Sequence, residues 1–310
     1  MATMPAPTLS DDDLSEVVQA ADEVAIRSQR SFIWSMRLHY TLLVVAAACG
    51  SFAFIIPGTD ADAVAILGAL CFGASLMLRV YRNTKDSESQ WLTARAVAES
   101  TKGDSWRYAV GGIPFTPDLD SRAARRLFLE RQQDEILDLG LTLADQGADL
   151  AYLTPAMKRL RAQDFQTRRD SYLNDRLADQ LRWYARKSKQ HTTLADRWFV
   201  GMLLAEAAGL AAAVIKAAGL LDLDLLGIFA AMASAFGAWN QMRQHRRTAG
   251  AYRRTAATLA TLLAGAREDL TEEAWPAFVD RAERLMGDEL SAWQALRLAE
   301  AGKSTDESAA

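Results

Sequence analysis

The chain has 310 residues, of which 50% are hydrophobic and 24% are charged, and its formal net charge is −4. This composition excludes a disordered chain and a collagen, and two cysteines, Cys49 and Cys71, are too few for a disulfide-rich mini-protein. The small negative charge gives no long-range attraction to nucleic acid, so we expect no nucleic-acid partner.

The first segment, residues 1–20, contains the acidic run Asp11–Asp13 and two prolines but few large apolar residues. We expect it to be a mobile tail. The first 30 residues also lack an apolar stretch, so we expect no cleavable signal peptide.

Four apolar runs, almost free of charge, follow in two pairs. They extend over Tyr40–Ile56, Ala63–Leu78, Trp198–Leu221 and Leu225–Met242. At 1.5 Å per residue, helices of about 16 to 18 residues span roughly 24–27 Å, slightly less than a hydrocarbon core of about 30 Å. Length alone therefore fits transmembrane helices or the buried helices of a large soluble α-protein.

The charges that flank these runs favour transmembrane helices. The turns within the pairs, residues 57–62 and 222–224, contain aspartates but neither Lys nor Arg. The opposite ends are basic, with Arg27, Arg30, Arg37, Arg79, Arg82, Lys85, Arg182, Arg186, Lys187, Lys189, Arg197, Arg243, Arg246, Arg247, Arg253 and Arg254. Because cytoplasmic flanks retain Lys and Arg, the pattern predicts four transmembrane helices in two hairpins, with both termini and the central segment in the cytoplasm. The alternative, a soluble helical core, would not explain why Lys and Arg lie at one end of each hairpin and aspartates at the other.

Aromatic residues occur near the predicted cytoplasmic boundary, where amphipathic rings prefer to lie. These candidate interface anchors are Tyr40, Tyr81, Trp198 and Trp239. The alternative is that each ring packs in a protein core.

The pattern of the rest of the chain predicts cytoplasmic amphipathic helices. No segment has the alternating pattern of a strand, so the predicted class is all-α. We expect helices over 83–103, 118–138, 166–190 and 243–266, with Gly103, Gly111, Gly112 and Pro114 breaking the first of them, and a last helical region around Trp275. The predicted domains are a tail (1–20), a first two-helix membrane module (21–117), a helical linker (118–155), a second module with C-terminal helices (156–300) and a second tail (301–310).

Small residues recur at every fourth position of the third and fourth runs. They are Gly201, Ala205, Gly209, Ala213, Ala217, Gly227, Ala231 and Ala235. Such a stripe lets helix backbones approach closely in a membrane, within a hairpin or between subunits. The alternative is that an alanine-rich composition scatters small residues by chance.

Two charged residues fall inside the third run. Glu206 lies eight residues past Trp198, roughly 12 Å along the helix, too deep to reach the interface easily. It is a candidate pore-lining or gating acid, or else a neutral, hydrogen-bonded residue that fixes the helix register. Lys216 lies close to the outer interface, where its side chain can extend to water.

No pattern of catalytic or cofactor-binding residues was found. His39, His191 and His245 are dispersed without cysteine or carboxylate at metal-ligand spacing, so no metal is expected; a role in pH sensing and a simple surface location both stay open. Gly302-Lys303-Ser304 lacks the partner glycine of a phosphate-binding loop, because position 297 is Arg. We expect neither an enzyme nor a cofactor.

Two segments resemble the SLATT superfamily of two-helix membrane effector modules, which occur beside SMODS-type nucleotide synthases or SLOG-type sensors. The first includes Trp91–Arg95, Trp106–Tyr108 and Gly112–Phe115, and the second includes Tyr172–Arg176, Gln180, Trp183-Tyr184 and Lys187, with Glu289 and Trp293 near its end. The chain looks like a tandem of two such modules, covering about residues 25–115 and 165–298.

The resemblance implies a pore-forming effector of a bacterial anti-phage or other conflict system, in the inner membrane. Four helices are too few to enclose a wide pore, so we expect a homo-oligomer in the lipid bilayer, gated through its cytoplasmic helices. A nucleotide second messenger or a separate sensor protein would supply the signal. The alternative function is a non-conducting membrane scaffold that assembles partner proteins.

Overall fold

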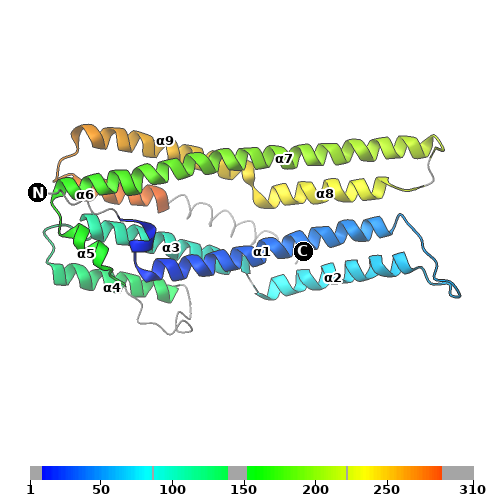
Figure 1. Ribbon diagram of the computed structural model, residues 1–310, viewed down its shortest axis with the longest axis horizontal. Coiled ribbons are helices and arrows are strands. Elements are labelled where there is room, and N and C mark those ends of the chain that lie inside the picture. Colours follow the sequence, from blue (N-terminus) through cyan, green and yellow to red (C-terminus); the bar gives the residue numbers. More distant parts are fainter. Residues whose placement is uncertain (1–8, 86, 139–151, 221–222, 288–310) are drawn as a thin grey trace, which may run out of the picture. The chain divides into compact units, whose positions relative to one another are not determined.

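A computed structural model describes residues 9–85, 87–138, 152–220 and 223–287, and these residues are helical apart from turns and connections (Figure 1). Their only β-type pairing is the isolated bridge between Ile55 and Asp62. The prediction of an all-α fold is confirmed.

The chain divides into two compact units, each built from segments far apart in sequence. The helical unit comprises residues 1–27, 89–186 and 251–310, and the hairpin unit comprises residues 28–88 and 187–250. The predicted modules, 21–117 and 156–300, therefore each contribute to both units. The two compact units therefore do not correspond to the two predicted modules.

The hairpin unit contains the apolar parts of α1 (Glu16–Cys49), α2 (Ala63–Lys85), α7 (Ala178–Ala217) and α8 (Leu226–Arg243). In the first hairpin, a hydrogen bond of 2.8 Å joins Ser75 Oγ to His39 Nδ1. In the second, the ring of Trp198 lies 5.7 Å from that of Trp239. The two hairpins meet near their loops, where Ser51 Oγ donates to the Asp224 carbonyl at 2.6 Å.

Within the described ranges, three helices are long and apolar enough to cross a membrane. They are α1, the part of α2 from Ala63 to Arg82, and the continuous helical stretch Phe165–Ala217, which includes α7. The 18-residue helix α8 is not among them, and its last turn includes Asn240, Gln241 and Arg243. The fourth transmembrane helix therefore stays a prediction.

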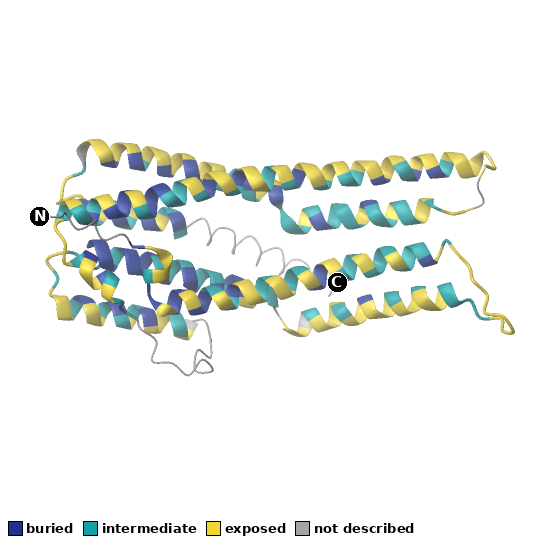
Figure 2. Cartoon of the chain, viewed as in Figure 1, coloured by how far each residue is buried: buried dark blue, intermediate teal, exposed yellow. Residues whose placement is uncertain are grey.

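The helical unit packs short and long helices around an aromatic core. It contains η1 (Asp11–Asp13), the start of α1, α3 (Ser87–Val110), α4 (Ser121–Asp138), α5 (Pro155–Arg161), α6 (Phe165–Ser171), the π-helical turn η3 (Tyr172–Leu177), most of α9 (His245–Asp269) and a final helix over 275–287. The fully buried side chains include Trp106, Phe115, Phe128, Tyr172 and Trp275. Figure 2 shows that this unit holds most of the buried residues, whereas the hairpin helices expose long faces.

The predicted mobile tail over residues 1–20 is wrong from residue 9 onward. Leu9 and Leu14 are buried in the core, and α1 already begins at Glu16. The acidic run forms a short 3₁₀ turn, in which Ser10 and Asp13 cap each other. The tail predicted over 301–310 lies outside the described residues.

Two predicted helix boundaries also differ from the structure. Gly103 lies inside α3 rather than ending it. A Cβ at this position would lie 3.2 Å from Glu283 Oε2, so the glycine leaves room for close packing against the final helix. The helix ends at Val110, before Gly111 with φ +79°. The predicted helix over 243–266 is interrupted at Gln244, whose left-handed φ of 46° separates α8 from α9.

The segment predicted as a linker, 118–155, belongs in its described part to the core. Helix α4 contributes Ala124 and Phe128, both fully buried, and Leu153 is also buried. Residues 139–151 lie outside the described part of the chain. The described ends of the segment are packed elements and not a spacer.

Candidate functional site in the apolar hairpins

Glu206 lies on a face of α7 that does not pack against α8. The neighbouring Ala205 is buried, and Gly209 lies against Phe229 of α8, but Glu206 itself is exposed. In the part of the chain that the structure describes, its carboxyl has no hydrogen bond or ion pair. A single chain therefore supplies no partner for this acid within an apolar helix.

Lys216 lies in the last turn of α7 and pairs with Asp224, with Nζ 3.2 Å from Oδ2. Both side chains are about half exposed. The pair lies next to the loop of the second hairpin, whose Asp224 carbonyl also accepts the hydrogen bond from Ser51. This position is consistent with a structural contact at the loop end of the hairpin.

Two of the small residues of α7, Gly201 and Gly209, lie along its contact with α8. A Cβ on Gly209 would come within 3.2 Å of Phe229, and one on Gly201 within 3.6 Å of Phe236. Of the remaining predicted positions, Ala205 is buried, Ala213, Ala231 and Ala235 are half-buried, and Ala217 is exposed. Gly227 has no atom within 4 Å of a Cβ position, so it makes no close helix contact in this chain.

The four candidate interface aromatics occupy different environments. Tyr81 is exposed, whereas Tyr40 and Trp198 are half-buried. Trp239 is 6% exposed and lies between the ring of Trp198 and the guanidinium of Arg37, which is 5.5 Å above its centroid. Trp239 thus contacts protein from both hairpins.

The structure brings two of the three histidines together. His191 on α7 and His245 at the start of α9 place their Nδ1 atoms 3.0 Å apart, next to the break at Gln244. Burial, followed by the charge of Arg243 and the His191 ring, lowers the pKa of His245 to about 4. No group of three or more His, Cys, Asp or Glu in the described ranges is arranged to hold a metal ion.

The helical unit contains a buried ion network that sequence reasoning missed. Arg176 on η3 binds Glu283 on the final helix, and the Tyr172 hydroxyl donates to the same carboxylate at 3.0 Å. Burial and then the Glu283 charge raise the pKa of Tyr172 well above its ordinary value. The tyrosine therefore stays a neutral hydrogen-bond donor.

A second branch of the network joins α3, α4 and the final helix. The buried Asp104 of α3 accepts from Arg131 Nε of α4 at 2.6 Å and from Arg107 Nη1 at 3.2 Å. Arg107 also lies 3.5 Å from Asp280. The sequence shows where these charged residues lie along their helices. It does not show which of them pair, because the partners are far apart in the chain.

Arginines also fix the connection that follows α3. Arg161 donates to the carbonyls of Tyr108, Phe115 and Thr116, and its guanidinium lies over the Tyr108 ring at 4.9 Å. The Val110 carbonyl accepts from Arg168 Nη1 at 3.0 Å and from the Trp275 indole at 2.8 Å. The carbonyls at the end of α3 thereby gain partners from other helices.

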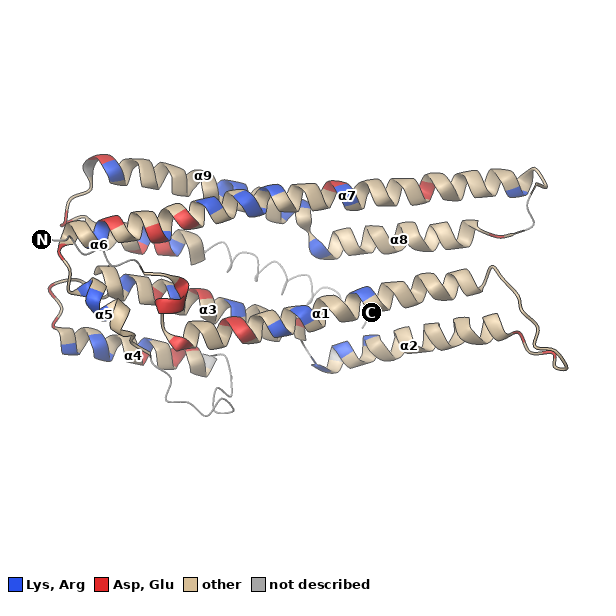
Figure 3. Ribbon diagram, viewed as in Figure 1, with Lys and Arg blue, Asp and Glu red and all other residues tan. Residues whose placement is uncertain are grey.

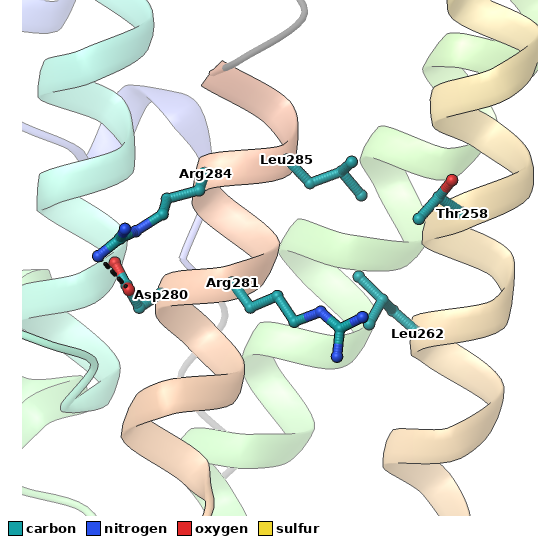
Figure 4. Close-up of a pocket in the computed structure, with 6 residues that line it drawn as sticks. All are labelled: Thr258, Leu262, Asp280, Arg281, Arg284 and Leu285. Carbon is teal, nitrogen blue, oxygen red and sulfur yellow. Dashed lines mark ion pairs between the residues drawn. The ribbon is translucent and has the colours of Figure 1, made fainter.

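A groove of about 490 Å³ lies between α9 and the final helix (Figure 4). Its walls carry Thr258, Leu262, Asp280, Arg281, Arg284 and Leu285. Arg284 is bound to Asp280 at 2.8 Å, whereas Arg281 points toward Leu262 and has no ion pair among the described residues. The groove is large enough for a small ligand, and among the described residues the Arg281 guanidinium on its wall has no acidic partner.

Two family models match the chain in tandem. Residues 16–169 match SMODS and SLOG-associating 2TM effector domain 3, and residues 172–293 match SMODS and SLOG-associating 2TM effector domain 1. The chain belongs to the SLATT superfamily. The predicted tandem arrangement is confirmed, and the matched regions meet between Arg169 and Tyr172, where α6 leads into η3. No curated protein and no solved structure matched the chain significantly.

The SLATT matches and the apolar helices together identify a membrane protein. SLATT domains are effector domains, so the chain is a membrane effector of the type found in conflict systems. The ion network joins the two SLATT regions within the helical unit, because Asp104 and Arg107 belong to the first and Glu283 and Asp280 to the second.

Proposed function

We propose that this SLATT tandem is one subunit of a homo-oligomeric, gated pore in the inner membrane of a bacterium, where it acts against phage or another invader. The observation that carries the proposal is the position of Glu206, which is exposed, surrounded by apolar residues of α7 and without a partner among the described side chains. A charged carboxylate facing lipid costs several kcal/mol (about 3 or more). A water-filled axis between subunits would remove that cost.

The proposed topology places the loops of both hairpins outside and both termini in the cytoplasm. The loop of the first hairpin carries Asp60 and Asp62, whereas Arg79 and Arg82 lie at the other end of α2. Two 2TM family matches in one chain support four crossings in total. A cysteine at Thr59 is therefore expected to react with an impermeant thiol reagent added outside intact cells, and one at Glu273 is not.

Gating would use the helices shared by the two units. Helices α1 and α7 each begin in the helical unit and end in the hairpin unit, so a change at their cytoplasmic ends would extend along continuous helix. Such a shift between two packings needs no catalytic chemistry, and we propose that the chain is not an enzyme.

The signal would reach the helical unit as a nucleotide second messenger or through a separate sensor protein. The groove between α9 and the final helix has the size for a small molecule, and the guanidinium of Arg281, which forms no ion pair with the described carboxylates, would attract a phosphate. Replacing Arg281 by alanine would raise the nucleotide concentration needed for opening. The same replacement would change little if a protein delivers the signal elsewhere.

The test asks whether water reaches Glu206 in assembled chains. In a background without Cys49 and Cys71, Glu206→Cys is expected to react with a charged, water-soluble thiol reagent and to cross-link between subunits in proteoliposomes. Leu204→Cys, an exposed position on the opposite side of α7, is the matched control and should resist the reagent because it faces lipid.

Conductance separates the proposed pore from the alternative scaffold. Glu206→Gln and Glu206→Leu are expected to change ion passage in opened proteoliposomes, whereas Glu273→Gln, an exposed change in the helical unit, is not. Oligomers that cross-link but leave position 206 unreactive and the vesicles sealed would support a non-conducting scaffold.

A further inference from the structure

Three exposed arginines at the base of the first hairpin have no acidic partner in the part of the chain that the structure describes. Arg30 and Arg37 on α1 and Arg79 on α2 form no ion pair with the described carboxylates. Several arginines of the helical unit differ, because they bind carboxylates or carbonyls. Examples are Arg95, Arg107, Arg131, Arg161, Arg168 and Arg176.

Helix α1 presents these cations in one exposed stripe. Arg30, Trp34 and Arg37 are spaced four and three residues apart and therefore share a face of the helix. Trp34 is 64% exposed. The same face continues with the uncharged Thr41 and the apolar Val45, both exposed, so the basic stripe ends at Arg37 and an uncharged face follows it.

Helix α2 places Arg79 beside the part of α1 where the basic stripe ends, near Arg37. The contact of Arg82 with the Met36 sulfur and the hydrogen bond between Ser75 and His39 fix the antiparallel register on either side of Arg79. Figure 3 shows the basic residues of α1 and α2 at the end of the hairpin opposite the acidic loop. The cations of both helices therefore lie where the apolar part of the hairpin begins.

Arg37 is held in place without using its hydrogen-bond donors. Its guanidinium lies over the Trp239 ring, 5.5 Å from the centroid. A cation–π contact uses the face of the guanidinium, whereas its N–H groups point outward in the plane. In the described structure these N–H groups have no acceptor, so they are available to an oxygen-rich anion.

We propose that Arg30, Trp34 and Arg37 of α1, together with Arg79 of α2, form a site for the headgroup phosphate of an anionic phospholipid. Guanidinium groups match phosphate geometry, and an exposed indole prefers the membrane interface. The occupant is a lipid rather than a soluble anion, because the basic stripe leads directly into an apolar face that would hold an acyl chain. The site requires membrane insertion but not a pore.

The test measures lipid-dependent stability of the full chain in a neutral detergent. Dioleoylphosphatidylglycerol is titrated and the apparent melting temperature is recorded, with dioleoylphosphatidylcholine as the uncharged reference. We expect the anionic lipid to raise the melting temperature more, because a ligand that binds the folded state stabilises it. The difference should shrink at 0.5 M salt (roughly a 4 Å screening length).

The decisive variant is Arg30→Gln/Arg37→Gln/Arg79→Gln. Its apparent affinity for the anionic lipid should fall about fivefold per arginine, roughly a hundredfold in total. The matched control, Arg122→Gln/Arg125→Gln/Arg126→Gln, removes the same charge from exposed positions of α4 and should keep the lipid effect.

Equal melting temperatures in the uncharged lipid would show that both triple variants fold like the parent chain. Equal losses of lipid affinity in both variants would overturn the proposal, because the effect would then follow net charge alone. An identical response of the parent chain to the two lipids would also overturn it. Both readouts are independent of conductance, so they do not depend on the pore proposal.

Discussion

Arg176 and Glu283 form an ion pair that is almost closed off from solvent, with Nη2 2.8 Å from Oε2 and side chains that are 3% and 2% exposed. It joins η3, at the start of the second SLATT region, to the final helix of the same region. Gly103 of the first region lies directly against it, since a Cβ there would lie 3.2 Å from Glu283 Oε2. The pair therefore lies where the two regions meet.

Removing one member of this pair should be far more damaging than removing both. Glu283→Leu would leave the Arg176 guanidinium buried without its charge partner, which typically costs about 3–5 kcal/mol of unfolding free energy. The double variant Arg176→Met/Glu283→Leu should recover most of that loss, because it buries no uncompensated charge. Denaturant unfolding of the full chain in detergent measures both.

The exposed pair Arg182–Asp179 provides the comparison, with side chains that are 58% and 50% exposed. Asp179→Asn should cost less than about 1 kcal/mol, because solvent screens the pair. If Glu283→Leu were as mild as Asp179→Asn, or if the double variant were no better than the single one, this account of the buried pair would be wrong.

Arg161 should not tolerate replacement by lysine. Its planar guanidinium serves carbonyls of Tyr108, Phe115 and Thr116 at once, and an ammonium on a flexible stem cannot reach all three. Unsatisfied buried carbonyls cost about 1–3 kcal/mol each, so we expect Arg161→Lys to lower the unfolding free energy by at least about 1 kcal/mol.

The neighbouring Arg159 is exposed and provides a matched control for Arg161. Arg159→Lys conserves charge at almost the same place in α5 and should be neutral within about 0.5 kcal/mol. Equal melting curves for the two lysine variants would contradict the assigned role of Arg161.

The hairpins could be predicted because their signals are local. The apolar run Ala63–Leu78 and the charges at its two ends lie within one stretch of chain, and the structure places α2 from Ala63 to Lys85. Hydropathy and flanking charge are enough to predict such a helix, without knowing which other helices it packs against. The same holds for Glu206, which was identified by its depth within an apolar run.

The helical unit could not be predicted in this way, because its contacts join distant residues. The Trp275 indole binds the Val110 carbonyl across 165 positions of sequence. Gly103 suggested a helix end, since glycine disfavours helices, but its lack of a side chain serves packing against Glu283 instead. Similarly, Leu9 and Leu14 are too few to show a pattern, although both are buried in the core.

Gly209 and Gly227 should respond differently to the same substitution. Gly209→Leu would force a side chain against Phe229, which lies 3.2 Å from the Cβ position, and overpacking of this kind costs about 1–3 kcal/mol. At Gly227 the Cβ of the new side chain would have no atom within 4 Å. We therefore expect a lower melting temperature for Gly209→Leu alone, measured in detergent.

Gly227→Leu also tests the assembly, because its side chain would project away from α7. Loss of the oligomer with an unchanged melting temperature would place Gly227 at a contact between subunits. If Gly227→Leu destabilised the single chain as much as Gly209→Leu does, the described packing of α7 against α8 would be wrong.

The His191–His245 pair should make folding sensitive to acid. The folded-state pKa of His245 is about 4, because of burial and of the neighbouring Arg243 and His191, whereas an unfolded histidine titrates near 6.5. Between these values the unfolded chain binds a proton that the folded chain does not. This contribution to stability is therefore complete above about pH 6.5 and lost as the pH falls toward 4.

The expected loss is up to about 3 kcal/mol over this interval, since each pKa unit corresponds to about 1.4 kcal/mol. His245→Phe removes the titrating group, so its unfolding free energy should fall less steeply between pH 6.5 and 4.5 than that of the parent chain. Parallel pH profiles for the parent chain and His245→Phe would show that the pair does not carry the acid sensitivity.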